Sequence, residues 1–351
     1  MPPIRILLIG PYSPPRGGVQ AHILALHQYL QAHDVPCEVI DLSPQRTTNG
    51  AGIYGPRSAL DLARLLLKLR YDVVHLHVGG DLTSRLALLA LLCATLPPRK
   101  AILTFHSGGY PSSPAGRAAR PRSLRGFALR RLSRVIAVNE EIEKWFRQVG
   151  VEPKRVGLIA PHAVPASAPD VKLPEQLQSF FETHKPVLVS VGGLEPEYDV
   201  PLQIDALRAM RENFPQAGLV VVGGGSLKDE LAQRVSSEPF GEHVLLCGDL
   251  ARELTLRVIA DSDVMLRTTL YDGDSISVRE AVHFGVPVVA SDRAPRPEGV
   301  RLVPAQNLER LTEAIEQCLL EQARRPARAE ASEENLRAVL TLYEKVVREP
   351  S

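Results

Sequence analysis

The sequence has 351 residues, of which 44% are hydrophobic and 23% are charged, and its formal net charge is +1. This length suits two domains better than a single core, and the composition is ordinary for a globular protein. A net charge this small gives no global field that would attract nucleic acid, so we expect no nucleic-acid partner. The four cysteines are scattered without a CxxC pair, which favours reduced thiols over disulfides or a zinc site.

The chain offers no obvious membrane or export segment. No apolar run reaches the 18 residues that a transmembrane helix requires, and Met1 leads directly into a strand-like segment without a charged leader. We therefore expect a cytoplasmic protein.

Short apolar runs alternate with segments of helical periodicity along the first half of the chain. The predicted strands are 4–9, 37–42, 73–77, 101–105, 135–138 and 156–159. The predicted helices are 19–30, 60–69, 82–96, 125–132 and 140–149. This alternation predicts parallel βαβ units with right-handed crossovers.

Residues 161–186 interrupt this alternation with several prolines, among them Pro161, Pro165, Pro169 and Pro174, which predicts a linker followed by a short helix near 177–181. The same alternation then resumes. The predicted strands are 187–191, 218–222, 244–247, 264–266 and 286–290. The predicted helices are 201–213, 226–235, 254–260, 277–284, 308–321 and 333–348.

We predict an α/β fold of two doubly wound parallel-sheet (Rossmann-like) domains that face each other across a cleft. The first domain is expected at 1–168 and the second at 169–330, with a C-terminal helix at 331–351 packing back on the first. Ligands of such sheets bind beyond the carboxyl ends of the strands, so the candidate residues are those that follow strands.

Three candidates follow strands of the first half. Gly17 and Gly18 open a helix, where backbone N–H groups can meet an anion, although they are also ordinary turn glycines. His75 and His77 share one strand face and could be half of a metal site, but we find no third ligand obviously placed to complete it. We therefore favour a packed, hydrogen-bonded imidazole there. His106 follows a strand and precedes Ser-Gly-Gly, which suits either substrate contact or a loop cap.

In the second half, acidic residues and hydroxyls precede a predicted helix and a buried strand, in the stretch YDGDSISVREAVHFGVPVVASD (271–292). Asp272, Gly273 and Asp274 could be read as a D-x-D metal motif, but the loop position and the lack of a second acidic cluster argue against metal. Ser275 or Ser277 is expected to cap the helix. Glu280 has apolar neighbours, which favours a carboxylate that points into the cleft rather than to solvent.

These motifs together resemble family 4 glycosyltransferases of the GT-B fold, over about 300 residues. The resemblance rests on the Gly17-Gly18 loop and on DVVHLH (72–77), TFHSGG (104–109), VIAVNEEI (135–142), LIAPHAV (158–164), VSVGGLEPEYDVPLQIDAL (189–207), LVVVGGG (219–225) and DGDSISVREAVHFGVPVVASD (272–292). The family has an N-terminal acceptor domain and a C-terminal nucleotide-sugar domain. It transfers the sugar with retention and needs no metal.

The resemblance also implies roles for single residues. Asp272 and Glu280 stand at the two positions of the family's E-x7-E motif, whose first carboxylate contacts the donor sugar and whose second contacts the nucleotide ribose. His106 and Asp272 are then the catalytic candidates. The candidate donor-binding residues are Gly17, Gly18, Arg267, Gly273, Asp274, Ser275, Arg279 and Glu280.

The sequence departs from the family at the diphosphate site. The family's Arg and Lys, which grip the phosphates, are replaced by Gly193 and Tyr198. Three interpretations follow: other cations such as Arg267 or Arg279 serve the phosphates, the leaving group differs, or the protein binds a sugar or nucleotide without turnover. We favour the first, and keep as the alternative a non-catalytic nucleotide-sugar sensor or scaffold.

Seven arginines lie within 117–134, interleaved with apolar residues. Arg117, Arg120 and Arg122 could rest on an anionic membrane, meet a phosphorylated acceptor or form a solvated helix face. Because many family members build polysaccharides on lipid-linked acceptors, we expect a nucleotide sugar and a glycan or lipid-linked acceptor as partners. A peripheral position at the inner face of the membrane is part of this expectation.

Overall fold

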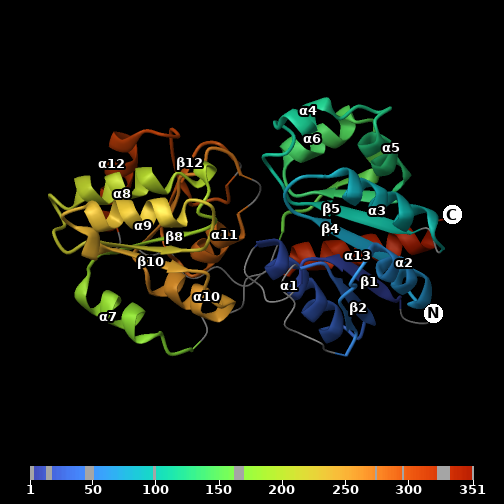
Figure 1. Ribbon diagram of the computed structural model, residues 1–351, viewed down its shortest axis with the longest axis horizontal. Coiled ribbons are helices and arrows are strands. Elements are labelled where there is room, and N and C mark those ends of the chain that lie inside the picture. Colours follow the sequence, from blue (N-terminus) through green and yellow to red (C-terminus); the bar gives the residue numbers. More distant parts are fainter. Residues whose placement is uncertain are drawn as a thin grey trace. The chain divides into compact units, whose positions relative to one another are not determined.

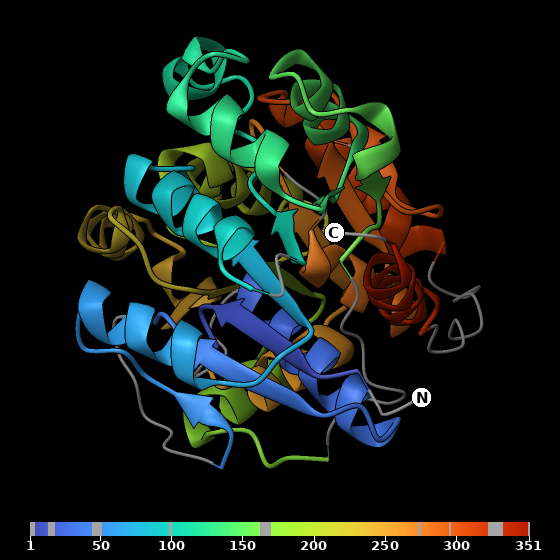
Figure 2. The same ribbon diagram turned by 90° about the vertical axis from the view of Figure 1, so that its right-hand side faces the viewer.

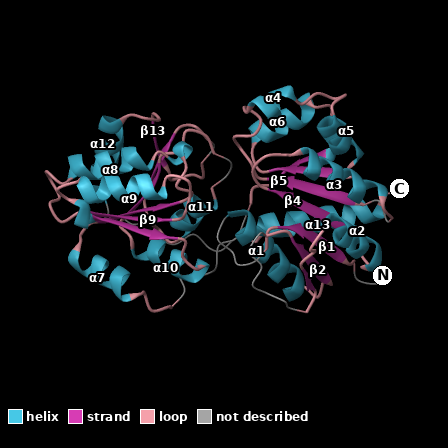
Figure 3. Ribbon diagram, in the orientation of Figure 1, coloured by secondary structure: helices cyan, strands magenta, loops and turns pink. Residues whose placement is uncertain are grey.

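The computed structural model describes residues 4–12, 18–43, 51–97, 100–161, 170–272, 275–294, 296–321 and 333–349. It divides into two compact units, which are drawn in Figure 1. Unit 1 consists of Met1–Ala163 together with Ser332–Ser351, and unit 2 consists of Val164–Ala331. In each unit the strands, magenta in Figure 3, form one sheet with helices on both faces.

Unit 1 contains a seven-stranded parallel sheet in the order β3-β2-β1-β4-β5-β6-β7. Its strands are β1 (Ile6–Gly10), β2 (Cys37–Asp41), β3 (Ile53–Tyr54), β4 (Val73–Val78), β5 (Ala101–Phe105), β6 (Arg134–Ala137) and β7 (Val156–Leu158). Its helices are α1 (Gly18–Ala32), α2 (Ala59–Lys68), α3 (Ser84–Thr95), α4 (Pro114–Ala118), α5 (Leu124–Arg131), α6 (Glu140–Gln148), the 3₁₀ turn η1 (Pro153–Arg155) and α13 (Glu334–Arg348).

Alternate side chains of each strand reach opposite faces of this sheet, as the pleat requires. Leu7 and Ile9 of β1 pack under α2, α3, α5 and α6, whereas Ile6 and Leu8 pack on the face that α1 and α13 cover. Such double coverage explains why the strands read as continuous apolar runs. Figures 1 and 2 show α13, in red, beside the strands of unit 1 in both views.

Unit 2 contains a six-stranded parallel sheet in the order β10-β9-β8-β11-β12-β13. Its strands are β8 (Val187–Val191), β9 (Gly218–Val222), β10 (Val244–Gly248), β11 (Val264–Arg267), β12 (Val288–Ser291) and β13 (Arg301–Val303). Its helices are α7 (Glu175–Thr183), α8 (Val200–Met210), α9 (Lys228–Ser237), α10 (Arg252–Asp261), α11 (Ile276–His283) and α12 (Leu308–Glu321), with 3₁₀ turns η2 (Pro196–Tyr198) and η3 (Gly241–His243).

Two apolar clusters pack against this second sheet, one on each face. Leu188 and Leu266 pack against α8 and α12, while Val189 and Met265 pack against α7, α10 and α11. All predicted strands and helices are present to within a few residues. Six short elements were not predicted, namely β3, α4, β13 and the 3₁₀ turns η1, η2 and η3. They have only two to five residues each, too few for a periodic pattern to stand out.

None of the helices that the structure describes combines the length and the apolar character needed to cross a bilayer. All four cysteines are free thiols, as their scattered positions predict.

The C-terminal helix α13 makes one polar contact inside the core of unit 1. The hydroxyl of Tyr343 lies 2.5 Å from Nδ1 of His75, whose Nε2 lies 2.7 Å from Oγ1 of Thr104. Both rings are fully buried, so water cannot replace a lost partner.

We predict that Tyr343→Phe lowers the free energy of unfolding of unit 1 by about 1–3 kcal/mol, because it leaves Nδ1 of His75 buried without its partner. Trp145 is the only tryptophan and lies in unit 1, so its fluorescence during denaturation measures this unit. Tyr29→Phe is the matched control, since that hydroxyl has no hydrogen-bond partner among the described residues. Equal stability of the two variants would contradict the prediction.

Candidate functional site

The carboxyl ends of two neighbouring strands of unit 2 bring three charged side chains together. Arg267 is the last residue of β11, and Asp272 follows it in the loop before α11. Arg296 comes from the segment after β12, which pairs with β11 in parallel. We call Arg267, Asp272 and Arg296 the arginine–aspartate cluster. It lies at the sheet edge where α/β proteins bind ligands.

The carboxylate of Asp272 lies between the two guanidinium groups. Arg267 donates from Nε to Oδ2 at 2.8 Å and from Nη2 to Oδ1 at 3.0 Å, a bidentate arrangement. Arg296 donates from Nη1 to Oδ2 at 2.8 Å. The exposed side-chain fractions of Arg267, Asp272 and Arg296 are 8%, 11% and 2%. The cluster is therefore a buried group with two positive charges and one negative charge.

Burial and ion pairing shift the pKa values of this cluster in opposite directions. Burial alone would raise the pKa of Asp272, but the charges and hydrogen bonds of Arg267 and Arg296 outweigh it and the pKa is lowered. Burial likewise lowers the pKa of Arg267, but the neighbouring carboxylate outweighs it and the pKa is raised. The Asp272 carboxylate and the Arg267 guanidinium are therefore both ionised at neutral pH.

The guanidinium of Arg267 also contacts the end of β8. Its Nη1 donates to the carbonyl oxygen of Val191 at 2.9 Å, and its Cζ lies 4.8 Å from the centre of the Tyr198 ring. A Cβ atom on Gly192 would come within 2.3 Å of that ring and 2.9 Å of Nη1, so no larger residue fits there. Arg267 is thus held beside the Gly192-Gly193 segment, with Tyr198 stacked on it.

Unit 2 contains a second buried ion pair. Glu280 of α11 is 3% exposed, and its Oε1 lies 2.7 Å from Nη1 of Arg252, the first residue of α10. Burial raises the pKa of Glu280, and Arg252 offsets part of this increase. Glu280 is therefore not a solvated residue of the helix surface, while its direction into the cleft stays a prediction.

The other predicted donor-side residues lie at the start of α11 and α1. Ser275 is the N-cap of α11, and its hydroxyl accepts from the backbone N–H of Val278, as predicted. Arg279 is half-buried on α11, and Gly18 is the first residue of α1. Gly17, Gly273 and Asp274 lie outside the described residues. The structure therefore joins Arg267 to Asp272, whereas Glu280 pairs with Arg252.

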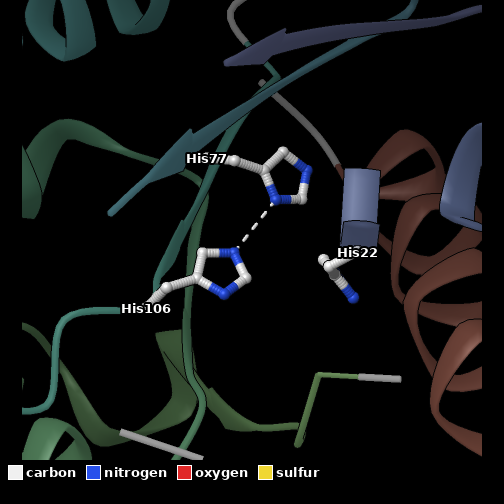
Figure 4. Close-up of side chains that lie close together, drawn as sticks. All are labelled: His22, His77 and His106. Carbon is white, nitrogen blue, oxygen red and sulfur yellow. Dashed lines mark hydrogen bonds between the residues drawn. The ribbon is translucent and has the colours of Figure 1, made fainter. Parts of the chain in front are cut away.

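Unit 1 contributes a separate group of imidazoles at the carboxyl edge of its own sheet. We call His22, His77 and His106 the histidine cluster; they belong to the first turns of α1, to β4 and to the residue after β5. Nδ1 of His77 and Nε2 of His106 lie 3.3 Å apart, and the ring of His22 lies 5.5 and 5.2 Å from those of His77 and His106 (Figure 4). The expectation that no third ligand stands near His77 was therefore wrong.

Sequence reasoning also missed Arg252 and Arg296. Arg296 follows β12 by five residues, so the rule that ligands bind beyond strand ends was the available signal. Arg252 begins a helix, and no sequence signal pairs it with a residue 28 positions away.

The three arginines assigned to the acceptor or membrane side lie around α4. Arg117 is in α4, and Arg120 and Arg122 lie between α4 and α5. All three are exposed, and none forms an ion pair with a carboxylate among the described residues. Arg120 instead donates to the carbonyl groups of Arg117 and Ala119.

Two family models match the chain in succession. The one described as a glycosyl transferase 4-like domain matches residues 15–162, and the one described as glycosyl transferases group 1 matches residues 174–335. Together with the two parallel-sheet units, these matches define a glycosyltransferase of the GT-B fold. The chain belongs to the family 4 type of these proteins.

Among curated proteins, the chain is similar to the Escherichia coli UDP-Gal:alpha-D-GlcNAc-diphosphoundecaprenol alpha-1,3-galactosyltransferase, with 26% identity over 246 residues, or 67% of this chain and 62% of that protein. It is 28% identical over 156 residues, 41% of each chain, to the GDP-mannose-dependent alpha-(1-6)-phosphatidylinositol monomannoside mannosyltransferase of Mycolicibacterium smegmatis. The chain thus spans less than two thirds of the length of these relatives. The Anabaena HepE structure in complex with UDP-glucose has a TM-score of 0.69, 18% identity and 98% coverage of both chains, which shows the fold.

We predict that Asp272→Asn destabilises unit 2 by about 3–5 kcal/mol at pH 7, because two buried guanidinium groups lose their counter-charge. The pKa of Asp272 is lowered in the folded protein. The contribution of its carboxylate to the stability of unit 2 is therefore full above the unfolded pKa of about 3.9, and it is lost as the pH falls below that value. The difference in stability between the variant and the wild type should therefore become smaller in acid. Hydrogen exchange of the β11 amides measures this stability.

Asp292→Asn is the control for this experiment, because that side chain is 48% exposed and its one ion pair among the described residues is with Arg293. The control should change the stability by less than about 0.5 kcal/mol. A loss in Asp272→Asn that does not shrink below pH 4 would show that charge pairing is not its cause.

Proposed function

We propose that the protein transfers a hexose-like sugar, with retention, from a nucleotide-sugar donor to a glycan or lipid-linked acceptor. The position of Arg267 beside the Gly192-Gly193 segment is the observation that carries this proposal. It is where the resemblance to the family leads us to expect a phosphate-binding arginine, in place of which the chain has Gly193. Family membership and the glycosyltransferase relatives support the same reaction class.

The arginine–aspartate cluster has the charge that a departing nucleoside diphosphate requires. During transfer, the bond between the anomeric carbon and the phosphate oxygen breaks, and negative charge develops on the diphosphate. Donors that are held in place before the reaction stabilise such charge without reorganisation. Asp272 and the β8 carbonyl fix Arg267 in one orientation, while Arg296 supplies the second positive charge.

The two carboxylates have different roles in this proposal. Glu280, buried against Arg252, is proposed to accept hydrogen bonds from the nucleotide ribose. Asp272 is proposed to act near the transferred sugar, with the additional role of orienting both guanidinium groups. His106 remains the proposed substrate contact in unit 1. We expect the transfer to need no metal ion, since guanidinium groups provide the positive charge at the donor diphosphate.

A lipid-linked acceptor is favoured by the charge distribution of unit 1. Residues 57–134 contain fourteen Lys and Arg but only three Asp and Glu, although the whole chain has a net charge of +1. Helices α2, α3 and α5 cover one face of the sheet, and their outer sides expose Leu60, Leu67, Leu88, Leu124 and Phe127. Cations combined with exposed apolar side chains suit the surface of an anionic membrane. The names of both curated relatives include a lipid-linked acceptor.

A non-catalytic nucleotide-sugar sensor is the second candidate, and the bidentate pairing of Arg267 favours it. A guanidinium already held by Asp272 has fewer N–H groups to offer a phosphate. The sensor and the enzyme both bind a donor, so binding alone does not distinguish them, whereas turnover does.

We predict that Arg267→Ala lowers sugar transfer at least tenfold, equivalent to about 1.4 kcal/mol of transition-state stabilisation. The assay combines a panel of nucleotide sugars with lipid-linked and glycan acceptors, and it also measures slow hydrolysis of each donor. Arg293→Ala is the control, because Arg293 is 58% exposed and lies two residues after β12, the strand that pairs with β11.

Two outcomes would contradict this proposal in different ways. If wild-type protein binds a nucleotide sugar but shows neither transfer nor hydrolysis, the protein is a sensor. If transfer occurs and Arg267→Ala leaves it unchanged in a folded protein, the phosphates are bound by another cation, and Arg279 becomes the first candidate.

We also predict that replacing Arg117, Arg120 and Arg122 with Ser weakens binding to vesicles containing anionic lipid by up to about 3 kcal/mol. The effect should be larger at low salt, where screening is weakest. The matched control replaces Lys144, Arg147 and Lys154 with Ser, because carboxylates already pair with these three cations. Absence of wild-type vesicle binding at low salt would exclude the membrane-contact part of the proposal.

A further inference from the structure

The histidine cluster contains more imidazole than a substrate contact by His106 requires. One ring nitrogen from each of His22, His77 and His106 lies within 4.8 Å of the corresponding nitrogens of the other two. The three residues come from three segments that meet at the carboxyl edge of one sheet, so the fold rather than local sequence brings them together. Figure 4 shows the three side chains close together.

The geometry of the closest pair fits shared coordination of one ion. Two imidazoles on a tetrahedral zinc ion, with Zn–N bonds of about 2.0–2.1 Å, place their nitrogens about 3.4 Å apart. The His77 and His106 nitrogens are 3.3 Å apart. The ring of His22 needs to approach by roughly 1–1.5 Å, a movement that rotation of one side chain provides.

His77 is well shielded from solvent. It is 2% exposed, and Nε2 of His106, 3.3 Å from Nδ1 of His77, is the hydrogen-bond partner that the described residues offer this Nδ1. An ion between the two rings would take the place of this one contact.

We infer that His22, His77 and His106 form a binding site for a divalent transition-metal ion of the Zn²⁺ type. Three imidazoles suit Zn²⁺, Co²⁺, Ni²⁺ or Cu²⁺ and provide no carboxylate or carbonyl oxygen for Mg²⁺ or Ca²⁺. Three protein ligands leave a fourth tetrahedral position for water or for an oxygen of an anionic ligand. This site belongs to unit 1 and is distinct from the donor diphosphate site proposed in unit 2.

The test measures metal binding directly, without any transfer assay. Full-length protein, freed of any affinity tag and stripped with a chelator, is titrated with Co²⁺ and Zn²⁺. We expect one Co²⁺ per chain with the visible absorption of a tetrahedral nitrogen site, and its displacement by one equivalent of Zn²⁺. His22→Gln, His77→Gln and His106→Gln should each lower the affinity at least tenfold.

His33→Gln is the matched control, because this exposed histidine lies just beyond the end of α1 and outside the cluster. This variant should bind Co²⁺ and Zn²⁺ as the wild type does. Circular dichroism and Trp145 fluorescence check the fold. If His77→Gln does not fold, His22→Gln and His106→Gln decide the result. Absence of stoichiometric binding, or equal binding by folded His22→Gln and His106→Gln, would overturn the inference. The histidines would then be a neutral hydrogen-bonding cluster, and the proposed sugar transfer would be unaffected.

Discussion

A parallel sheet must be covered on both faces, and this requirement determines most of the architecture. Parallel strands are joined by crossovers, so their connecting helices must lie on the faces of the sheet. In unit 1, the segments between the strands supply α2, α3, α5 and α6 to one face but only α1 to the other. Helix α13, from the opposite end of the sequence, covers the remaining apolar surface with Leu336, Val339, Tyr343 and Val346.

The same requirement explains why the candidate sites are where they are. In a sheet whose strands all run in one direction, every carboxyl end lies at the same edge. Residues far apart in sequence, such as His22 and His106 or Arg267 and Arg296, therefore become neighbours. These edges also hold charged and polar side chains that would be unfavourable in the core. Burying Arg267 and Arg296 is tolerated because Asp272 and backbone carbonyls satisfy much of their hydrogen-bonding capacity.

The sequence was sufficient to predict the fold, because buried strands and amphipathic helices have strong and different periodicities. It also indicated that Glu280 is not a solvated residue and that Ser275 or Ser277 caps α11, since both conclusions depend on neighbours within a few residues. The ion pairs Arg252–Glu280 and Arg296–Asp272 were not predictable, because they join residues 28 and 24 positions apart through the packing of loops and helix starts. His22 was missed for the same reason: its helical position says nothing about which strand end it faces.

The contact of α13 with unit 1 affects the order in which the chain can fold during synthesis. Unit 2 is one continuous segment, Val164–Ala331, whereas unit 1 needs both Met1–Ala163 and Ser332–Ser351. Domains generally fold as units, the N-terminal one first as it leaves the ribosome. Here the first unit to be translated cannot complete its core until Val346 has left the ribosome, after all of unit 2. Throughout that interval, Ile6, Leu8 and His75 remain without their C-terminal cover, so the N-terminal half is the part of the nascent chain that most depends on protection from aggregation.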